Sequence, residues 1–296
     1  MEIRTRRDIW VHLMLYPGHT LPTAAAPILV GIGLALHDGT FALWPALIAF
    51  LCSWLVHVGG VFLDVHELVR RHPLVREHPE LNDAVARGEL RLPILRGATL
   101  AWFGAAIVPG IYLYRVVGPF SIILGLIGIL GSASYALGRR SVAARGLADL
   151  VFFVMFAFVA TPATYYVQAL HAPLAAFVVG LPIAALVVNV LVIDDIRDVD
   201  FDRAKGWRTT AVRFGIATSR REHLAFTLLA YALPLAFAVV WGPWLLLPLA
   251  TLPLAVAAER AVQTAPRREV LIPWTPRSAL LAMGYAALLA AGLALA

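Results

Sequence analysis

Five aspartates follow an apolar stretch of the sequence that is long enough to form a buried helix. They are Asp194, Asp195, Asp198, Asp200 and Asp202. Helical spacing places Asp194, Asp198 and Asp202 on one face, with Asp195 beside Asp198. Because stacked like charges destabilise a helix, we expect a cation to lie against this face. Hard oxygen ligands suit Mg²⁺ or Ca²⁺, and Mg²⁺ usually shares one or two carboxylates with substrate phosphates.

Basic residues are interleaved with these aspartates. They are Arg197, Arg203, Lys205 and Arg208. Guanidinium and ammonium groups form strong charge-assisted hydrogen bonds with phosphate oxygens. A solvated acidic cap that simply ends a helix is the alternative interpretation, and the interleaved cations favour a phosphate site over it.

A second acidic helix end is predicted earlier in the chain, within residues 57–71. Asp64 and Glu67 are three residues apart and share a helix face, with His57 and His66 nearby. Ionisable groups at the edge of a membrane span are costly, and they indicate function by default. An ordinary interfacial turn is the alternative for this pair.

The composition indicates a membrane protein. Of the 296 residues, 60% are hydrophobic and 14% are charged, and the mean hydropathy is +0.80. Apolar stretches long enough to cross a bilayer recur along the whole chain and leave no soluble domain over. We therefore predict an all-α polytopic membrane protein with a single domain over residues 1–296.

Nine membrane spans are predicted from the apolar stretches. They cover Leu21–Leu36, Phe41–Leu63, Gly97–Tyr114, Pro119–Leu137, Leu147–Leu170, Pro173–Ile193, Leu224–Trp241, Trp244–Ala258 and Ala279–Ala296. The two acidic helix ends follow the second and the sixth span, on the same side of the membrane. This spacing of four spans indicates two four-helix pseudo-repeats plus a final helix, arranged around a central cavity.

The distribution of cations predicts the orientation. In this layout 23 of the 24 Lys and Arg residues fall on one side, and Arg115 alone falls on the other. Basic loops are retained in the cytoplasm, so both acidic helix ends are expected on the cytoplasmic side of the cell membrane. The formal net charge of +6 therefore reflects topology. We predict membrane lipids as partners through anionic headgroups, and no nucleic acid.

Three stretches of the sequence resemble a known family. Thr20–Gly31 contains T-L-P-T-A-A-A-P-I-L-V-G, and Gly146–Asp149 is followed by T-Y-Y-V-Q at Thr164–Gln168. Residues 189–215 contain R-D-x-x-x-D-R-x-x-G-x-R-T-x-A-V-R-x-G. Together with the span layout, these stretches resemble the UbiA-type intramembrane prenyltransferases. The branch they resemble most is that of the 1,4-dihydroxy-2-naphthoate prenyltransferases of menaquinone synthesis.

The resemblance implies a bundle of nine helices around a cavity, with two acidic motifs that hold Mg²⁺ and a prenyl diphosphate. Asp198 and Asp202 stand where the family has its second-motif aspartates. Asp194 and Asp195 stand where this branch usually has asparagines. In the loop that follows, the matching residues are Arg203, Gly206, Arg208 and Thr209.

The first acidic motif departs from the family pattern. When Asp64 takes the place of the pattern's second aspartate, Gly60 and Val61 fall where asparagine and aspartate belong. In the shifted register, Val65 takes an aspartate position. Asp64 remains an oxygen donor for a metal, and Glu67 is a candidate to replace a lost aspartate.

These patterns predict the site residues. The predicted metal ligands are Asp64, Glu67, Asp194, Asp195, Asp198 and Asp202. The predicted catalytic residues are Asp64, Glu67, Asp149, Asp198 and Asp202. The predicted substrate-binding residues are Arg91, Arg139, Arg140, Arg145, Arg203, Lys205, Arg208 and Tyr135. Asp149 has two interpretations, since it could orient or deprotonate an acceptor or only cap its helix.

The predicted reaction is Mg²⁺-dependent ionisation of a prenyl diphosphate within the membrane. The prenyl chain is then transferred to a small aromatic acceptor such as 1,4-dihydroxy-2-naphthoate. Aromatic faces are expected to stabilise the carbocation, with Phe62, Phe152, Phe153 and Phe156 as candidates beside Tyr135. The altered first motif favours one alternative, an intramembrane terpene cyclase that needs no acceptor. A transporter of lipids or small molecules is the alternative from a different class.

Overall fold

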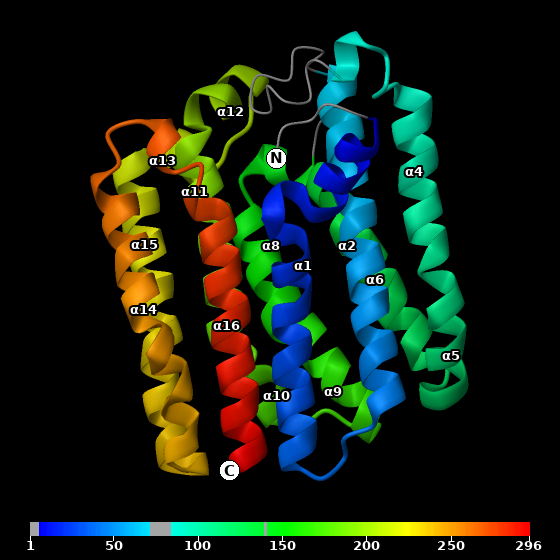
Figure 1. The fold of residues 1–296 in the computed structure, drawn as a ribbon, viewed down its shortest axis with the longest axis vertical. Helices are drawn as coiled ribbons and strands as arrows, with labels where there is room; N and C mark the ends of the chain where they lie inside the picture. Colours follow the sequence, from blue (N-terminus) through cyan, green and yellow to red (C-terminus); the bar gives the residue numbers. More distant parts are fainter. Residues whose placement is uncertain (1–5, 72–83, 139–140) are drawn as a thin grey trace.

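The computed structural model describes residues 6–71, 84–138 and 141–296. In these residues all regular structure is helical. The helices form an elongated bundle, with the short helices α12 (Val199–Lys205) and α13 (Thr210–Phe214) at one end. The C-terminus lies at the opposite end (Figure 1).

The bundle consists of long helices and of paired shorter ones. In the first half of the chain they are α1 (Arg6–His37), α2 (Leu43–Arg71), α4 (Leu92–Ala105), α5 (Ile107–Val117) and α6 (Phe120–Ala136). The short α7 (Val142–Arg145) precedes α8 (Ala148–Val154), a π-helical turn (Met155–Ala160), α9 (Thr161–Ala169) and α10 (Leu174–Val178). The second half contains α11 (Leu181–Arg197), α14 (Ile216–Trp241), a 3₁₀ segment (Pro243–Thr251), α15 (Leu252–Thr264), a short 3₁₀ turn (Arg268–Val270) and α16 (Trp274–Leu295).

Seven of the described helical segments are long and apolar enough to cross a membrane. Two shorter apolar helices, Leu21–His37 and Phe120–Ala136, lie at the two remaining predicted positions. The described part of the protein is therefore all-α, with helices suited to span a membrane, as predicted. The count of nine crossings and the four-helix pseudo-repeat remain predictions.

Several predicted spans are not single α-helices. The third is divided between α4 and α5 at Ala106, shortly before Pro109, and the fifth contains the π-helical turn just before Pro162. Proline lacks the N–H that would bond to the carbonyl four residues earlier, so a helix bends or changes its pitch there. The hydroxyl of Thr161 donates a hydrogen bond to the carbonyl of Phe156 at 3.1 Å, which satisfies one backbone group in this turn.

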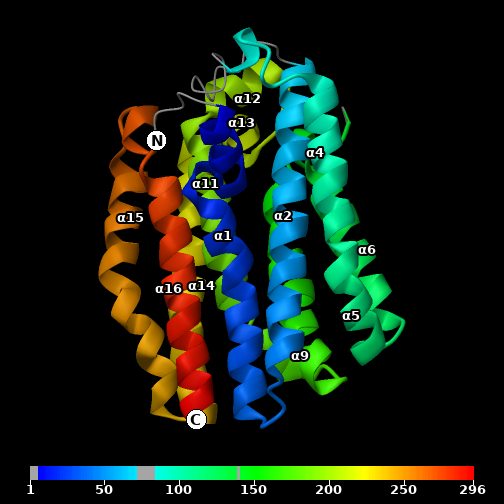
Figure 2. The ribbon, with the colours of Figure 1, turned by 45° about the vertical axis from the view of Figure 1, so that its right-hand side comes forward.

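The helix α11 is the centre of the bundle. It is packed against α1, α8, α14 and α16. In the segment Leu174–Arg197, which contains α11, 78% of the most apolar stretch is buried, more than in any of the other six long segments. Figure 2 shows α1 and α16 side by side in front of it. Because α11 carries the aspartates at its end, this packing fixes the position of the acidic segment.

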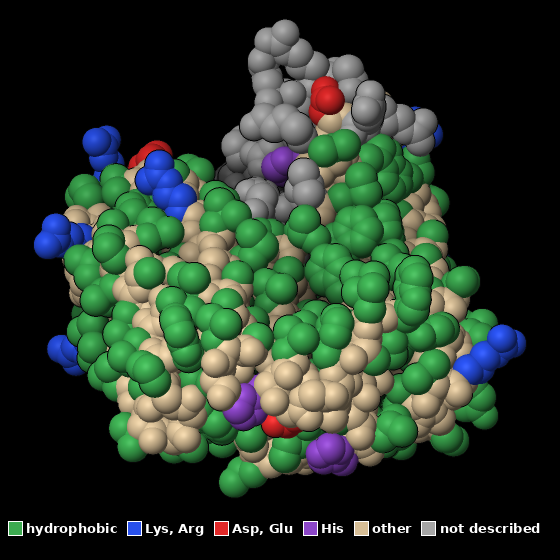
Figure 3. Space-filling view, turned by 60° about the horizontal axis from the view of Figure 1, so that its bottom comes forward, with side chains coloured by type: hydrophobic (Ala, Val, Ile, Leu, Met, Phe, Trp, Pro, Cys, Tyr) green, Lys and Arg blue, Asp and Glu red, His purple; other side chains and the backbone are tan. Residues whose placement is uncertain are grey.

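The outside of the bundle is apolar. Figure 3 shows hydrophobic side chains over most of the visible surface. Large hydrophobic residues such as Leu100, Val108, Leu130 and Val239 are at least 63% exposed. In water such a surface would promote association, whereas hydrocarbon solvates it.

The close approach of α1 and α16 depends on Gly33. A Cβ built at Gly33 would overlap Ala290 of α16, whereas a Cβ at Gly284, also on α16, would meet nothing within 4 Å. We predict that Gly33→Ala lowers the free energy of unfolding by about 1–3 kcal/mol through overpacking. Gly284→Ala should leave stability unchanged or raise it by up to about 1 kcal/mol, because alanine favours a helix.

The thermal unfolding midpoint of each variant in detergent measures this difference. Equal midpoints for the two variants would contradict the packing of α1 against α16.

Candidate functional site

A cavity of about 770 Å³ lies between α1, α2, α5, α6, α9 and α11. This volume is in the upper range for sites that bind small molecules. On α2 the lining residues extend from Ala49 to Leu68, so the cavity follows most of the length of that helix. Its wall is mainly apolar, and its charged groups gather at the end of the bundle that carries α12.

The carboxylates at the charged end come from both acidic segments. Asp64 of α2 lines the cavity together with Asp194, Asp195, Asp198 and Asp202. All five were predicted as metal ligands. The hydroxyl of Tyr135, on α6, lies within electrostatic range of Asp64, Asp194, Asp195 and Asp202. The structure thus brings together acidic residues that are about 130 positions apart in the sequence.

The second acidic segment is not one continuous helix. The helix α11 ends at Arg197, Asp198 has the non-helical angles φ −106° and ψ 16°, and α12 begins at Val199. The backbone N–H of Asp198 still donates to the carbonyl of Asp194 at 2.8 Å, and that of Asp202 donates to Asp198 at 2.9 Å. These bonds keep the four-residue spacing across the junction. All three carboxylates therefore reach the cavity, as a single helix would have placed them.

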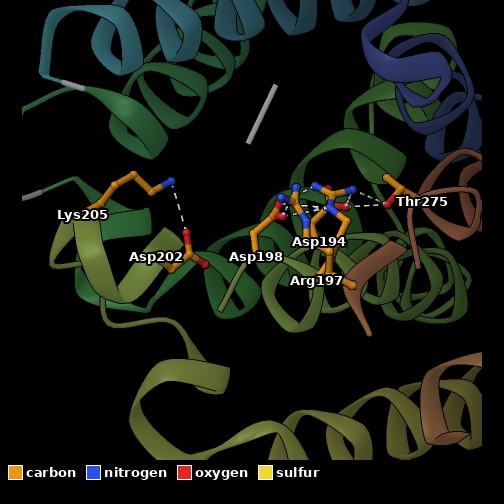
Figure 4. Close-up of polar contacts among 7 residues, drawn as sticks. Asp194, Arg197, Asp198, Asp202, Lys205 and Thr275 are labelled. Atoms are coloured by element: carbon orange, nitrogen blue, oxygen red, sulfur yellow. Dashed lines mark hydrogen bonds and ion pairs between the residues drawn. The ribbon is translucent and has the colours of Figure 1, made fainter. Parts of the chain in front are cut away.

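The side chain of Arg197 lies between two of these aspartates (Figure 4). Its guanidinium forms ion pairs with Asp194 at 2.6 Å and with Asp198 at 2.5 Å. It also donates to the hydroxyl of Thr275 at 2.9 Å, and that hydroxyl donates to Asp194 at 2.5 Å. Thr275, at the start of α16, thus fixes both members of the pair.

A second arginine reaches the same aspartate from another segment. Arg268 donates to Asp198 at 3.0 Å, and its guanidinium carbon lies 4.5 Å from the centre of the Phe201 ring. Neither Arg268 nor Thr275 was predicted from the sequence. They are at least 70 residues from Asp198, and no local motif marks them.

Lys205 pairs with the last aspartate of the segment. Its ammonium group lies 3.2 Å from Asp202 and 3.6 Å from the centre of the Trp207 ring. Both Lys205 and Trp207 line the cavity. Figure 4 shows Lys205 and Asp202 apart from the group around Arg197. Lys205 was predicted to bind substrate, and Trp207 was not predicted.

The donor set fits a hard divalent cation, because carboxylate oxygens are the ligands that Mg²⁺ prefers. Within the described residues, however, no three carboxylate, histidine or cysteine side chains converge on one point that could hold a metal. The reason is visible in the contacts: Arg197, Arg268 and Lys205 bond to oxygens of Asp194, Asp198 and Asp202. The positive charge expected against the acidic face is supplied here by basic side chains.

Glu67 does not reach the cavity. Its carboxylate accepts hydrogen bonds from Arg70 at 2.7 Å and 3.0 Å, from Arg71 at 2.7 Å, and from the backbone N–H of Gly138 at 3.3 Å. These contacts join α2 to the segment after α6. Asp64 is thus the member of the first acidic pair that lines the cavity.

Asp149 lies behind the charged end, outside the cavity lining. It is in the first turn of α8, whose N-cap residue is Leu147. Asp149 accepts a hydrogen bond from Thr210 at 3.2 Å, and its charge interacts with Asp195 and Glu222. Asp149 is not among the lining residues of the cavity. As an acidic residue in the first turn of α8 it stabilises the N-terminal end of that helix, although it is not the N-cap residue.

The structure separates most of the predicted basic residues from the cavity. Arg203 pairs with Asp200 at 3.0 Å on an exposed face of α12. Arg91, Arg145 and Arg208 are exposed and are not among the lining residues. The predictions for Arg139 and Arg140 lie outside the described residues.

Three of the five predicted aromatic residues line the cavity, namely Tyr135, Phe152 and Phe156. The ring centres of Tyr135 and Phe152 are 5.3 Å apart, and those of Phe152 and Phe156 are 5.8 Å apart. The other two pack elsewhere. Phe62 lies between Trp10 and Trp102, and Phe153 stacks on Phe226.

Comparison with known proteins gives a consistent result. The model of the UbiA prenyltransferase family matches residues 24–275. The chain is 29% identical over 277 residues to a 1,4-dihydroxy-2-naphthoate octaprenyltransferase of Mycobacterium tuberculosis, covering 93% of this chain and 94% of that protein. It is 29% identical over 256 residues to the Escherichia coli protein of the same name, covering 82% of each chain.

Solved structures share the fold. A UbiA homologue from Aeropyrum pernix has a TM-score of 0.67 at 16% identity, covering 93% of this chain and 96% of that chain. A UbiA homologue from Archaeoglobus fulgidus bound to GPP and Mg²⁺ has a TM-score of 0.64 at 15% identity, covering 94% of this chain and 98% of that chain.

The contacts of Thr275 lead to a prediction for cation binding. Thr275→Val removes the hydroxyl that bonds to both Asp194 and Arg197, so the carboxylate loses a group that orients it. We predict that binding of Mn²⁺, measured by electron paramagnetic resonance, becomes weaker by about 10–100-fold, as is usual when a partner of a metal ligand is lost. Thr275→Ser keeps the hydroxyl and should bind Mn²⁺ as the wild type does. Equal affinity in Thr275→Val and the wild type would contradict this role.

Proposed function

We propose a function from one premise: the chain belongs to the UbiA prenyltransferase family, whose model matches residues 24–275. The proposed reaction transfers a polyprenyl chain from its diphosphate to 1,4-dihydroxy-2-naphthoate. The relatives that cover most of the chain are named for this transfer. The observation that carries the proposal is a cavity that joins a charged end, lined by Asp64, Asp198 and Asp202, to a long apolar interior.

A prenyl diphosphate matches both parts of the cavity. Its diphosphate is the group that Arg197 and Lys205 are suited to bind, because both line the charged end. In the structure these side chains neutralise Asp194, Asp198 and Asp202. A bound diphosphate offers them phosphate oxygens as alternative partners, which leaves carboxylate oxygens available for a cation.

The residues proposed to hold Mg²⁺ are Asp64, Asp194, Asp195, Asp198 and Asp202. When bound, Mg²⁺ supplies Lewis-acid stabilisation of the negative charge on the departing diphosphate. We leave Glu67 out of this set, because it is bonded to Arg70 and Arg71 away from the cavity.

The protein's own residues stabilise and protect the charged species. Arg197 and Lys205 stabilise the departing anion at the charged end. The apolar wall excludes water from the allylic cation, and the faces of Tyr135, Phe152 and Phe156 lie where they can stabilise it. The C–O bond to the diphosphate breaks first, which gives the allylic cation and the diphosphate anion. A ring carbon of the acceptor then bonds to the cation, and that carbon loses its proton, or its carboxyl group as CO2, to restore the aromatic ring. Asp149 is proposed to act indirectly, through its charge interaction with Asp195.

The proposed location is the cell membrane, with the charged end on the cytoplasmic side. The arginine and lysine residues of α12, α13 and the segment before α16 gather at this end of the bundle. Such clusters are retained in the cytoplasm during insertion.

A terpene cyclase of the same family is the second candidate. The observation that favours it is that Asp64 is the one carboxylate of the first acidic segment among the lining residues, with Gly60 and Val61 beside it. A cyclase needs the same ionisation step but no acceptor. Family membership argues against the transporter alternative.

Product analysis separates the two candidates. Purified protein in detergent is given Mg²⁺ and prenyl diphosphates of several lengths, with and without 1,4-dihydroxy-2-naphthoate, and the products are identified by mass spectrometry. A prenylated naphthoate formed only with the acceptor supports the transferase. A cyclic hydrocarbon or alcohol formed without the acceptor supports the cyclase, and release of no diphosphate under either condition would overturn both.

A matched pair of variants tests the acidic segment. We predict that Asp202→Asn lowers kcat/KM by on the order of 10²–10³, because a proposed ligand of the Mg²⁺ that stabilises the departing diphosphate is lost. Asp200→Asn should keep wild-type turnover, since its side chain is 86% exposed and pairs with Arg203. Turnover and the thermal unfolding midpoint are measured for both variants. Retained activity in a folded Asp202→Asn protein would remove this residue from the site.

A further inference from the structure

The cavity has an unusual wall on α6. Ten residues of this helix line the cavity. Five of them form one helix face that is flanked by larger lining residues such as Ile122 and Ile129, and these five are Ser121, Gly125, Gly128, Ser132 and Tyr135. They recur every three or four positions, which is the spacing of one helix face. Four of the five have very small side chains, and the fifth is the tyrosine at the charged end. Between the flanking isoleucine and leucine side chains, this face therefore carries little side-chain volume from the charged end into the apolar interior.

The facing helix α2 touches this wall near the charged end and leaves more room further along. A Cβ built at Gly60 would overlap the hydroxyl oxygen of Ser132, so the helices meet there. A Cβ at Gly128 would lie 4.0 Å from Val56, and one at Gly125 would meet nothing within 4 Å. A Cβ at Gly128 or Gly125 therefore meets no clash, so a longer side chain can extend from it toward the cavity.

The positions differ in their depth along the helix. At a rise of about 1.5 Å per residue, Gly128 is about 10 Å from Tyr135, Gly125 about 15 Å and Ser121 about 21 Å. An apolar chain that enters from the charged end passes these positions in that order. The three residues thus mark successive depths of the space in which the chain lies.

We propose that Gly128, Gly125 and Ser121 determine, in order of depth, the longest prenyl chain that the protein accepts. The inference rests on the proposed function, because it takes the ligand to be a prenyl diphosphate whose head lies at the charged end. Their small size keeps the interior open, so the wild type accommodates a long donor. A large side chain at each position closes the interior at a different depth.

The test uses the full-length protein and a series of donors. Ser121→Leu, Gly125→Leu and Gly128→Leu are compared with the wild type for kcat/KM with all-trans prenyl diphosphates of increasing length and 1,4-dihydroxy-2-naphthoate. For each variant we expect kcat/KM to fall by about 10-fold or more for donors longer than a limit. The limit should be shortest for Gly128→Leu and longest for Ser121→Leu. The shortest donor should react with all three variants nearly as it does with the wild type.

Gly104→Leu is the matched control. It makes the same change on α4, at a glycine that is exposed, does not line the cavity, and has no atom within 4 Å of an added Cβ. Its donor profile should equal that of the wild type. If Gly128→Leu fails to fold, Val56→Phe fills the same depth from α2 and should give the same limit.

Two results would overturn the inference. One is a limit that does not follow the order of depth, and the other is an equal loss for all donors, which would indicate damage to the charged end. Failure of the proposed function is recognised separately, as absence of any prenylated product from the wild type. In that case the thermal shift produced by non-cleavable prenyl thiolodiphosphates of each length replaces turnover, and the same order of limits is required of it.

Discussion

The structure depends on placing several carboxylates at the end of its most buried helix. Asp198 and Asp202 are each at most 7% exposed, and an unpaired charge in such a position costs several kcal/mol. The protein meets this constraint with basic groups from three segments: Arg197 from α11 itself, Lys205 from α12 and Arg268 from the turn before α16. These contacts join the ends of the helices around the cavity. The same basic side chains are suited to bind an anionic substrate. The groups that stabilise the fold are therefore also the groups proposed to bind the diphosphate.

The residues of the cavity wall determine which kind of molecule fits the cavity. The charged end lies at one end of the bundle, and the remainder of the wall is apolar and lies within the membrane-spanning helices. A molecule with an anionic head and a long apolar tail fits both parts without leaving the bilayer. The apolar part also keeps water away from a reactive cation, which a soluble site would have to achieve by closing a lid. The small residues of α6 supply the room that the tail needs.

Hydropathy predicted the class of fold and the position of the apolar helices, because the bilayer requires long apolar segments. It did not predict the π-helical turn before Pro162, where local hydrogen bonding decides. Four-residue spacing predicted the cavity-facing aspartates, although the helix ends at Arg197. The ion pairs of Glu67 and Arg203 were not predicted. Arg70 and Arg71 bond to Glu67, and Asp200 bonds to Arg203, in place of a metal ion or a substrate. No sequence pattern marked Thr275, Arg268 or Trp207 as a site residue. Tertiary packing alone brings Thr275 to Asp194 and Arg268 to Asp198.

The central claim is that the charged end of the cavity holds a divalent cation and the diphosphate, while the prenyl chain lies along α6. The most direct measurement is an experimental structure of the protein with Mn²⁺ and a non-cleavable prenyl thiolodiphosphate, in which the metal is located by its anomalous scattering. The account predicts Mn²⁺ beside Asp198 and Asp202, Arg197 or Lys205 bonded to phosphate oxygens, and the chain passing Gly128. Mn²⁺ and diphosphate found at the other end of the cavity, near Tyr114 and Ser121, would contradict it.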